Sequence, residues 1–465
     1  MYIFWFRRDL RLVDNTGLNW IVNKNMNILP IFIFDKKQID RKNNDFFSDK
    51  SVQFLVESLK SLEMSIKKQK GAKLNIYYGD TRNIIEQLLK ENNVKGVVCN
   101  EDYTPFSINR DRDIQELCSM QNKEFISLMD IPLYDFTQIK TKSGSAYKRF
   151  KWFHRSTKNM SVDNVVDLSK NMKFVVAKKT IFDILLRTIE KKYSYSAYSF
   201  VNGGRKEGLR IMREHIPKLK DYKAVRQFPL LGKRVTSSHL SAYNKYGCIS
   251  IRELFYTIKN AYGVDHELIR QIVWRDFYYN LVYYYPDVFL YDNHSLFKDY
   301  SWNNDQTLFK AWCEGKTGYP FVDAGMRQLN REGYMANRLR LCCASFLIKN
   351  LDIDWRWGEK YFATRLVDYD PSQNNGNWQW VSSTGYESQA YYRYINPIKD
   401  LLEFDPECLY VKKYISELEN VSCTDIHSNT IPKKSKYPDR IVDIKETLEM
   451  FKTKYNILKD ETLNY

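Results

Sequence analysis

The pattern of the chain changes part-way along its length, and this change constrains the fold more than any other feature. In the first third, short β-rich runs at Tyr2–Phe6, Ile28–Phe34, Leu74–Tyr78 and Gly96–Cys99 alternate with polar periodic stretches such as Ser51–Gln69. Strands that alternate with helices predict a parallel sheet covered on both faces, with room for a nucleotide-type ligand at its carboxyl edge. No GxGxxG follows the first strand, which disfavours a dinucleotide-dependent dehydrogenase.

From Gly203 onward the pattern is helical almost throughout. Clear examples are Ile251–Ala261, His266–Tyr284 and Gln306–Glu314, and the polar, Lys-rich stretch after Val421 predicts a loop and one last helix. The fold class that we expect is a Rossmann-like α/β N-terminal domain followed by an all-α C-terminal domain.

The length of 465 residues is too great for one ordinary core. The irregular, Lys- and Ser-containing stretch from Ile131 to Phe200 is typical of a long connector. We therefore expect an α/β domain over residues 1–130, a connector over 131–200 and a helical domain over 201–465.

The formal net charge is +16. A surface of this charge attracts polyanions, and nucleic acid is the first candidate partner. The alternative is a Lys-rich solvated surface that reflects a biased composition, so charge alone leaves both interpretations open.

The eight cysteines contain no CxxC pair, and their spacing fits neither a disulfide framework nor a zinc site. We expect reduced cysteines and no metal ligands. The N-terminal segment is charged too early for a secretory signal, and no apolar run approaches the length of a membrane span. These features predict a soluble intracellular protein, cytoplasmic or nuclear, which we expect to be monomeric and free of the membrane.

The usual catalytic sequences are missing. The six histidines form no HxxxH or HExxH, and neither GxSxG nor GxxxxGK[ST] occurs. A zinc hydrolase, a serine hydrolase with a nucleophile elbow and a P-loop enzyme are therefore disfavoured. If the chain is an enzyme, a cofactor carries the difficult chemical step.

The densest unusual stretch runs from Trp355 to Gly385. It contains four tryptophans, the acids Asp368 and Asp370, and a pair of asparagines that begins at Asn374. A single Trp in such a place usually packs a core. Bulky aromatics clustered with polar side chains beside Gly are also typical of ligand sites.

A second stretch, Gln271–Tyr279, places an amide, an indole and a guanidinium on one helical face. Gln271, Trp274, Arg275 and Tyr278 follow the i, i+3, i+4 and i+7 spacing. Such a face suits a flat polar ligand such as a base. An amphipathic helix with its aromatics in the core is the competing interpretation.

Two further stretches carry groups that can bind phosphate. Arg338 and Arg340 in GYMANRLR can clamp phosphates or pair with acids. The TSSHLS segment from Thr236 precedes a helix, where hydroxyls and backbone N–H groups bind phosphate or cap the helix.

Together, and in this order, these stretches resemble the photolyase/cryptochrome family. The similarity runs over nearly the whole chain, from WFRRDLRLVDN at Trp5–Asn15 to RYINPIKD at Arg393–Asp400. Motifs of matching spacing lie between them: YKAVRQFP at Tyr222, TSSHLSAYNKYG at Thr236, WRDFYYNL at Trp274, AWCEGKTGYPFVDAGMRQL at Ala311 and NNGNWQW at Asn374.

The resemblance implies that the helical domain binds FAD. By position, the segment around the ribityl and phosphate groups is Tyr222, Ser237, Ser238, Leu240 and Ser241. The residues that resemble isoalloxazine and adenine contacts are Asn337, Arg338, Asp368 and Asp370. Asn374 matches the residue that faces flavin N5, where a neutral amide accepts from a protonated N5 and favours reduced flavin.

The resemblance also implies light-driven repair of DNA. Trp378, Trp355 and Trp302 match an electron-transfer chain that runs outward from the flavin. In the implied mechanism, excited reduced FAD donates an electron to a flipped-out pyrimidine dimer, the dimer splits and the electron returns. Flipping is needed because the cofactor cannot reach a lesion that is stacked in the duplex. Trp274 and Trp380 match the aromatic wedge against the dimer, and Gln271, Arg275, Tyr278 and Leu341 complete the expected substrate contacts.

The lesion is predicted from two positions. The (6-4) photolyase branch has His where this chain has Asn337 and Leu341, so the chain resembles repair of cyclobutane dimers by class I enzymes. Gln271 departs from that pattern, because the cyclobutane branch usually has Glu there, and Gln cannot supply a proton. A (6-4) photolyase and a signalling cryptochrome are the alternatives, and the short segment after Leu418 argues against the cryptochrome.

A second, antenna chromophore is left open. The Asn-Glu pair that folate-type relatives carry near Phe106–Ser107 is missing, so a deazaflavin, a flavin or no antenna all fit. The chain has no cysteine quartet for an iron–sulfur cluster.

Overall fold

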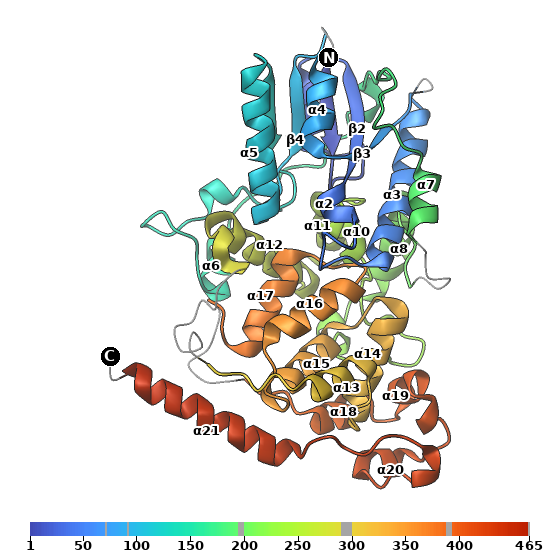
Figure 1. Ribbon diagram of the computed structural model, residues 1–465, viewed down its shortest axis with the longest axis vertical. Coiled ribbons are helices and arrows are strands. Elements are labelled where there is room, and N and C mark those ends of the chain that lie inside the picture. Colours follow the sequence, from blue (N-terminus) through green and yellow to red (C-terminus); the bar gives the residue numbers. More distant parts are fainter. Residues whose placement is uncertain (70–71, 91–92, 194–199, 290–299, 387–392, 464–465) are drawn as a thin grey trace. The chain divides into compact units, whose positions relative to one another are not determined.

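The computed structural model describes residues 1–69, 72–90, 93–193, 200–289, 300–386 and 393–463 (Figure 1). The chain forms two compact units. The first unit comprises Met1–Pro217, Ser238–Asp287 and Val367–Ser372, and the second comprises Lys218–Ser237, Val288–Leu366 and Gln373–Tyr465. These units divide the chain differently from the three expected segments, so the boundaries at residues 130 and 200 stay predictions.

The first unit is built around a parallel five-stranded sheet of order β3-β2-β1-β4-β5. Its strands are β1 (Tyr2–Phe6), β2 (Ile28–Asp35), β3 (Asn75–Gly79), β4 (Gly96–Asn100) and β5 (Glu124–Leu128). Four of them match the predicted runs, and β5 was not predicted because its residues are only partly buried and its sequence is mixed. The expected parallel α/β domain is confirmed.

Strand β1 shows why the sheet is covered on both faces. All five of its residues are buried, and alternate side chains point to opposite faces. Ile3 and Trp5 join a core with α4 (Thr81–Leu89) and α5 (Pro105–Met120). On the other face Tyr2 packs edge-on against Trp20 of α1 (Thr16–Asn23), with ring centroids 5.4 Å apart.

Helices surround this sheet and extend the first unit (Figure 1). The buried helix α12 (Glu267–Tyr284) packs against α6 (Phe150–Thr157) and α11 (Ile251–Tyr262). The remaining helices of the unit are α2 (Lys36–Ile39), α3 (Asp49–Lys67), α7 (Leu186–Lys192), α8 (Arg205–His215) and α10 (Ser241–Lys245).

The second unit is helical throughout its described part. Its central helix is α14 (Pro320–Glu332), which contacts α13, α15, α16, α18 and α19. The helices of this unit are α9 (Tyr222–Val225), α13 (Gln306–Glu314), α15 (Asn337–Lys349), α16 (Trp355–Arg365), most of α17 (Pro371–Ser382), α18 (Pro397–Phe404), α19 (Leu409–Tyr414), α20 (Cys423–Ser428) and α21 (Ile444–Leu463). The expected all-α C-terminal region with a last helix is confirmed.

The expectation that all cysteines are reduced is wrong. Cys408 and Cys423 form a disulfide whose Cα atoms lie 5.8 Å apart, and the other six cysteines are free and buried. The prediction failed because spacing along the chain does not reveal that the ends of α19 and α20 are neighbours. Among the described residues, no helix has the length and apolar character needed to cross a membrane.

Candidate functional site

The orientation of Asn374 on α17 is fixed by Glu359 of α16. Asn374 Nδ2 donates to the Glu359 carboxylate at 3.0 Å and to its backbone carbonyl at 3.2 Å. Both partners only accept hydrogen bonds, so the NH₂ group must face them. The amide oxygen is left as an acceptor. This arrangement fits a group that presents an N–H donor, as N5 of reduced FAD does.

Trp378 lies one helical turn after Asn374 and is 3% exposed. Its ring packs edge-on against Phe362 at 5.0 Å and lies 6.4 Å from the ring of Trp312. A Cβ atom at Gly358 would stand 2.2 Å from Trp378 Cη2. The absence of a side chain at Gly358 therefore allows this indole to lie directly on α16.

The three tryptophans of the predicted chain differ in burial. Trp378 is 3% exposed and Trp355, the first residue of α16, is 1% exposed. Trp302 is half-buried and its ring lies 4.4 Å from that of Tyr300. This gradient agrees with a relay whose last member reaches solvent, but the relay itself stays a prediction.

Three predicted residues lie at the start of α15. Asn337 is its first residue and is exposed, and Leu341, one turn later, is half-buried. Arg338 makes a two-pronged ion pair with Asp400 of α18, with Nε 2.7 Å from the carboxylate. The sequence did not predict this partner, and a flavin contact from Arg338 stays a prediction.

The TSSHLS segment is divided between the units. In the second unit the Ser237 hydroxyl lies 3.4 Å from that of Tyr334, and Tyr222 begins α9. In the first unit Leu240 precedes α10, whose first residue is Ser241, and the Ser238 carbonyl accepts from His215 Nδ1 at 3.2 Å.

His239 lies within the same segment. It has a left-handed backbone, φ 56°, and burial lowers the pKa of its ring to about 4, so it is neutral at pH 7.

Asp368 and Asp370 both belong to the short segment Val367–Ser372 of the first unit and are buried. The Asp370 carboxylate accepts from the Arg8 guanidinium and from the Tyr279 hydroxyl. These bonds tie the segment to the end of β1 and to α12. The predicted flavin contact of Asp370 therefore competes with two partners inside the protein.

The predicted face of α12 exists as a half-buried surface. Gln271, Trp274 and Arg275 are all half-buried, while Tyr278 is buried. Gln271 Nε2 donates to the Glu267 carboxylate one turn earlier, at 2.7 Å. The amide is thus oriented by a neighbouring acid.

The aromatic and basic members of this face have firm supports. The Trp274 ring stacks on Phe150 of α6 with centroids 3.6 Å apart and an interplanar angle of 7°. The Arg275 guanidinium lies 4.7 Å from the centre of the Tyr279 ring and donates to the Ile131 carbonyl at 3.0 Å. Trp274 is therefore held rigidly, whereas Arg275 is largely engaged within the first unit.

Trp380 lies in the second unit. It is half-buried, and the Arg393 guanidinium lies 3.9 Å from the centre of its ring. An indole with a cation on one face is electron-poor compared with a free one.

Sequence reasoning missed three residues that shape the site. Glu359 orients Asn374, Phe150 supports Trp274, and Trp312 is fully buried beside Trp378 with its indole N–H donating to the Cys343 carbonyl at 3.0 Å. An acidic residue inside the Trp-rich stretch was the sequence signal that could have pointed to Glu359. No sequence signal joins Phe150 to Trp274, because they are 124 positions apart.

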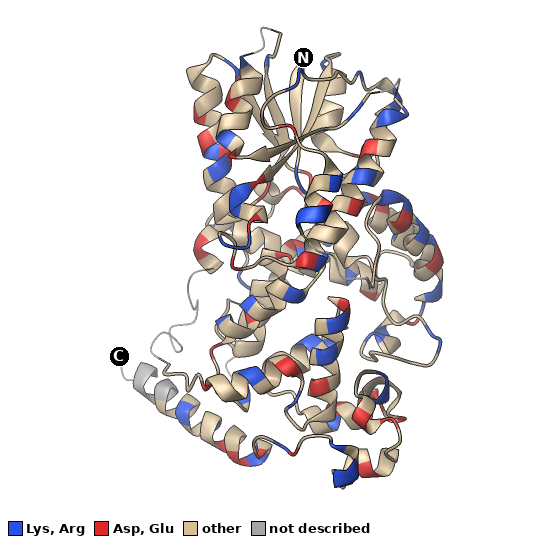
Figure 2. Cartoon of the chain, turned by 45° about the vertical axis from the view of Figure 1, so that its right-hand side comes forward, with Lys and Arg blue, Asp and Glu red and all other residues tan. Residues whose placement is uncertain are grey.

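Charge is distributed unevenly over the secondary structure. Figure 2 shows almost no charged residues on the strands of the sheet, whereas Lys and Arg lie on helices and loops of both units. On α6 and just before it, Arg149, Lys151 and Arg155 are exposed around Trp152, which is 47% exposed. This basic helix belongs to the same unit as the α12 face.

Comparison with known proteins matches two family models to this chain. The family model described as DNA photolyase matches residues 2–168, and the model described as the FAD binding domain of DNA photolyase matches residues 268–457. The deoxyribodipyrimidine photo-lyase of Vibrio cholerae is 32% identical over 97% of this chain and 99% of its own length.

Solved structures of the same kind superpose closely. An archaeal photolyase from Sulfolobus tokodaii, solved with two FAD molecules, has a TM-score of 0.86 at 37% identity and covers 98% of this chain and 99% of its own. A Synechocystis cryptochrome has a TM-score of 0.89 at 26% identity, with coverage of 97% and 98%.

The fold and these matches define a class of protein with a parallel α/β domain and a helical FAD-binding domain. The chain belongs to the photolyase/cryptochrome family.

Proposed function

We propose that this protein is a deoxyribodipyrimidine photolyase that repairs cyclobutane pyrimidine dimers in DNA with blue light. When bound, reduced FAD supplies the light-driven electron that splits the dimer and takes it back. The observation that carries the proposal is the fixed orientation of Asn374, whose amide oxygen is presented as an acceptor while Glu359 holds its NH₂ group. The names of relatives such as the Vibrio cholerae photo-lyase support it.

Several polar residues are proposed to hold FAD. Asn374 would accept from N5–H and would thereby favour the reduced cofactor. Asn337, exposed at the start of α15, offers a free-standing amide to the ring system, and Asp368 offers a buried carboxylate. Ser237, Ser238 and Ser241 offer hydroxyl and backbone donors to the phosphates.

A relay of three tryptophans is proposed to return electrons to oxidised cofactor before repair begins: Trp378, Trp355 and Trp302. Indoles are polarisable and oxidisable, and the first two are shielded from water at 3% and 1% exposure. Trp302 is half-buried, which gives an external reductant access to the end of the relay. Its neighbour Tyr300, at 4.4 Å, is a second oxidisable group at that end.

The lesion is proposed to meet the α12 face. A dimer that is extruded from the duplex exposes flat faces and amide edges, and damaged bases cost less to extrude than paired ones. Trp274 is preorganised for stacking by Phe150, and Gln271 presents an amide group beside it on the same face. Trp380 and the apolar Leu341 are proposed as further contacts to the lesion.

Damaged DNA is the proposed partner. Its phosphates suit the exposed basic side chains of Arg149, Lys151 and Arg155 around α6. Cyclobutane repair is favoured over (6-4) repair because Asn337 and Leu341 cannot donate a proton as an imidazolium can.

A light-dependent repair assay tests the proposal. The protein with reduced FAD is given DNA that carries either a cyclobutane thymine dimer or a (6-4) product, under blue light and in the dark. Loss of the cyclobutane dimer in the light alone supports the proposal. Repair of only the (6-4) product contradicts the lesion, and repair of neither, with FAD bound and photoreducible, moves the protein to the cryptochromes.

A second chromophore is also proposed, on the ground that the Sulfolobus tokodaii photolyase was solved with two FAD molecules. The carboxyl edge of the parallel sheet is its expected place, since ligands bind where the strand order reverses. Extraction and chromatography of bound pigments from the purified protein identifies whether this molecule is FAD or another type.

A further inference from the structure

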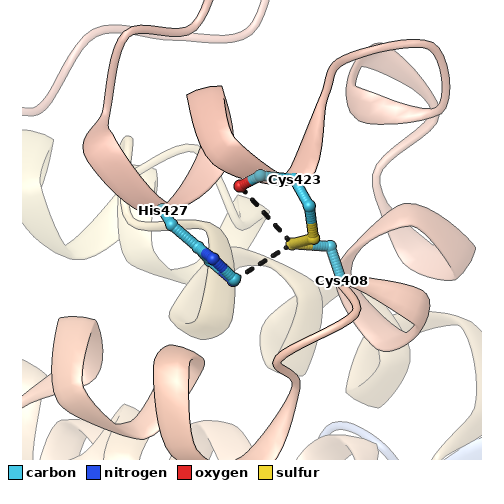
Figure 3. Close-up of side chains that lie close together, drawn as sticks. All are labelled: Cys408, Cys423 and His427. Carbon is cyan, nitrogen blue, oxygen red and sulfur yellow. Dashed lines mark hydrogen bonds between the residues drawn. A yellow bond between two sulfur atoms is a disulfide. The ribbon is translucent and has the colours of Figure 1, made fainter.

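Two cysteines and one histidine converge at the far C-terminal end of the second unit, outside the flavin and DNA residues described above. Cys408 immediately precedes α19, while Cys423 and His427 are separated by one turn of α20 and share one of its faces. Their ligand atoms, the two Sγ atoms and an imidazole nitrogen, all lie within 4.8 Å of one another (Figure 3). His427 Nε2 is 3.3 Å from Cys408 Sγ.

This cluster differs from the other cysteines. Cys99, Cys118, Cys248, Cys342 and Cys343 are buried free thiols in the cores. At the cluster, Cys408 is fully buried but Cys423 and His427 are half-buried, so an ion or a small reductant can reach it from solvent. In the part of the chain that the structure describes, no other such group of three His, Cys, Asp or Glu side chains occurs.

The backbone at Cys408 is a second, independent observation. Its φ of 53° lies in the left-handed region, where a residue with a Cβ atom costs about 1–2 kcal/mol more than glycine. A glycine would start α19 without this cost. A cysteine held there indicates that its thiol has a use, because strained positions persist where function requires the side chain.

We propose that Cys408, Cys423 and His427 form a redox-gated zinc site, which binds Zn²⁺ when the thiols are reduced and releases it when they form the disulfide. Two thiolates and one imidazole are a donor set that favours Zn²⁺ over Mg²⁺ or Ca²⁺. Three protein ligands leave one tetrahedral position for water. Compartments that keep thiols reduced favour the zinc form.

The same backbone serves both states. Cα atoms 5.8 Å apart suit a disulfide. Two Zn–S bonds of about 2.3 Å in a tetrahedron place the sulfurs roughly 3.8 Å apart, which rotation about the Cα–Cβ bonds provides. His427 already faces Cys408 Sγ, so neither helix has to move to complete the ligand set.

The two states interconvert by thiol–disulfide exchange, and in the oxidising direction a disulfide takes two electrons from the zinc-bound thiolates, becomes a dithiol with two protons from water, and Zn²⁺ leaves. A dithiol reductant breaks the S–S bond, gives two electrons and two protons to the sulfurs, and becomes a cyclic disulfide. Zn²⁺ then displaces one proton from each thiol and accepts a lone pair from an imidazole nitrogen of His427. Because the metal cross-links the start of α19 to α20, zinc stabilises the reduced protein by mass action.

The experiment uses the full chain with FAD bound. The protein is reduced with a non-chelating phosphine or left oxidised, equilibrated with Zn²⁺ alone, and desalted. Metal content is then measured by elemental analysis, and zinc-edge absorption reports the sulfur ligands. The variants are Cys423→Ser and His427→Gln, both at half-buried positions, and the matched control is Cys313→Ser, a free thiol of the same unit.

We expect one zinc per reduced chain, with two sulfur neighbours at about 2.3 Å, and none per oxidised chain. Cys423→Ser and His427→Gln should weaken binding by more than about 100-fold, since losing even an outer partner of a ligand costs 10–100-fold. Cys313→Ser should keep one zinc. Circular dichroism and FAD content verify that each variant is folded. The proposal is overturned if the reduced wild type binds no zinc, or if folded Cys423→Ser still binds one zinc.

Discussion

Glu359 holds the amide of Asn374 by two acceptors, its carboxylate at 3.0 Å and its backbone carbonyl at 3.2 Å from Nδ2. An amide can rotate by half a turn and exchange its oxygen with its nitrogen at little cost unless its neighbours fix it. Here the neighbours are acceptors alone. Glu359 therefore fixes which end of the Asn374 amide faces away from it, and in the proposed FAD site it is a positioning residue.

Replacing Glu359 with Leu should lower the midpoint potential of bound FAD. The amide is then held only by the backbone carbonyl of residue 359 and also populates the orientation that presents NH₂. That orientation favours the oxidised cofactor because oxidised N5 accepts hydrogen bonds. A net hydrogen bond of ~1 kcal/mol corresponds to roughly 40 mV for a one-electron couple. A spectroelectrochemical titration measures the shift.

Glu359→Gln is the matched control, since its side-chain oxygen still accepts from Asn374 Nδ2. Its potential should stay near that of wild type. Equal shifts in both variants would mean that the charge of Glu359, and not the orientation of Asn374, sets the potential.

Gly358→Ala should displace Trp378. The added methyl group would lie 2.2 Å from Trp378 Cη2 and 2.5 Å from Leu347 Cδ2. Overpacking of this kind costs about 1–3 kcal/mol in a core. We expect a lower free energy of unfolding and slower photoreduction of FAD. The absorption of the flavin under blue light, with an external reductant present, measures the rate of photoreduction.

The control is Gly325→Ala on α14, where a Cβ atom would meet Cys343 Sγ and Leu339 Cδ1 at 2.9 Å each. It strains the same unit without touching Trp378. Destabilisation with unchanged photoreduction is expected there. If both variants slow photoreduction equally, the effect comes from stability rather than from the position of the indole.

Trp302→Phe should remove most of the photoreduction but leave repair by chemically reduced protein intact. The relay needs an oxidisable ring at its solvent end, and Phe is much harder to oxidise. Trp152→Phe is the matched control, because Trp152 is also solvent-accessible, at 47% exposure, and has no proposed role in the relay. Fast photoreduction in Trp302→Phe would remove Trp302 from the relay and point to Tyr300 or another exit.

Gln271→Glu should repair cyclobutane dimers at least as well as wild type, and its advantage should grow as the pH falls. The new carboxyl would lie one turn from Glu267, to which Gln271 now donates at 2.7 Å. A neighbouring negative charge raises the pKa of a carboxyl group. Below that raised pKa the side chain carries one O–H, which is either donated to Glu267 or supplied to the dimer as a proton.

Repair yields at several pH values test this expectation, with Gln271→Glu in a Glu267→Gln background as the control. Without the second acid, the pH at which the advantage disappears should move down. A marked loss of repair by Gln271→Glu at every pH would contradict the placement of the dimer against this face.

The sequence predicted the architecture well because hydrophobic periodicity is local. The runs at Tyr2–Phe6 and Gln306–Glu314 coincide with a strand and a helix, and the 3.6-residue spacing placed Gln271 and Trp274 on one half-buried face. Strand β5 was missed because its residues are only partly buried and lack the apolar run of a central strand.

Long-range pairings explain what the sequence did not predict. Arg338 with Asp400, Phe150 with Trp274 and Cys408 with Cys423 are joined only by tertiary folding. The residue type limits the interactions that a side chain can make, and the partner that folding brings to it determines which of those interactions it makes. The sequence favoured a salt bridge for Arg338 over a phosphate contact, but it could not identify Asp400 as the partner.

The free energy of unfolding of the second unit should rise with pH above neutrality because of Lys349. This side chain on α15 is fully buried, and burial lowers its pKa to about 7 from an ordinary 10.5. Between these values the unfolded chain binds the proton and the folded chain does not, so raising the pH favours folding by up to about 1.4 kcal/mol per pH unit. Below pH 7 both states hold the proton and the contribution is constant.

Denaturant unfolding of wild type and Lys349→Met at pH 7.0–8.5 isolates this effect, since Met fills a similar volume without a titrating group. Asp405, whose pKa burial raises to about 6, has largely lost its proton by then and contributes little slope. The control is Lys310→Met, at a side chain that is 77% exposed, which should keep the wild-type slope. The Lys349 ammonium also lies 4.9 Å from the centre of the Phe451 ring, and this attraction favours the charged form. If the wild-type slope is as flat as that of Lys349→Met, this contact keeps the lysine protonated throughout the pH range.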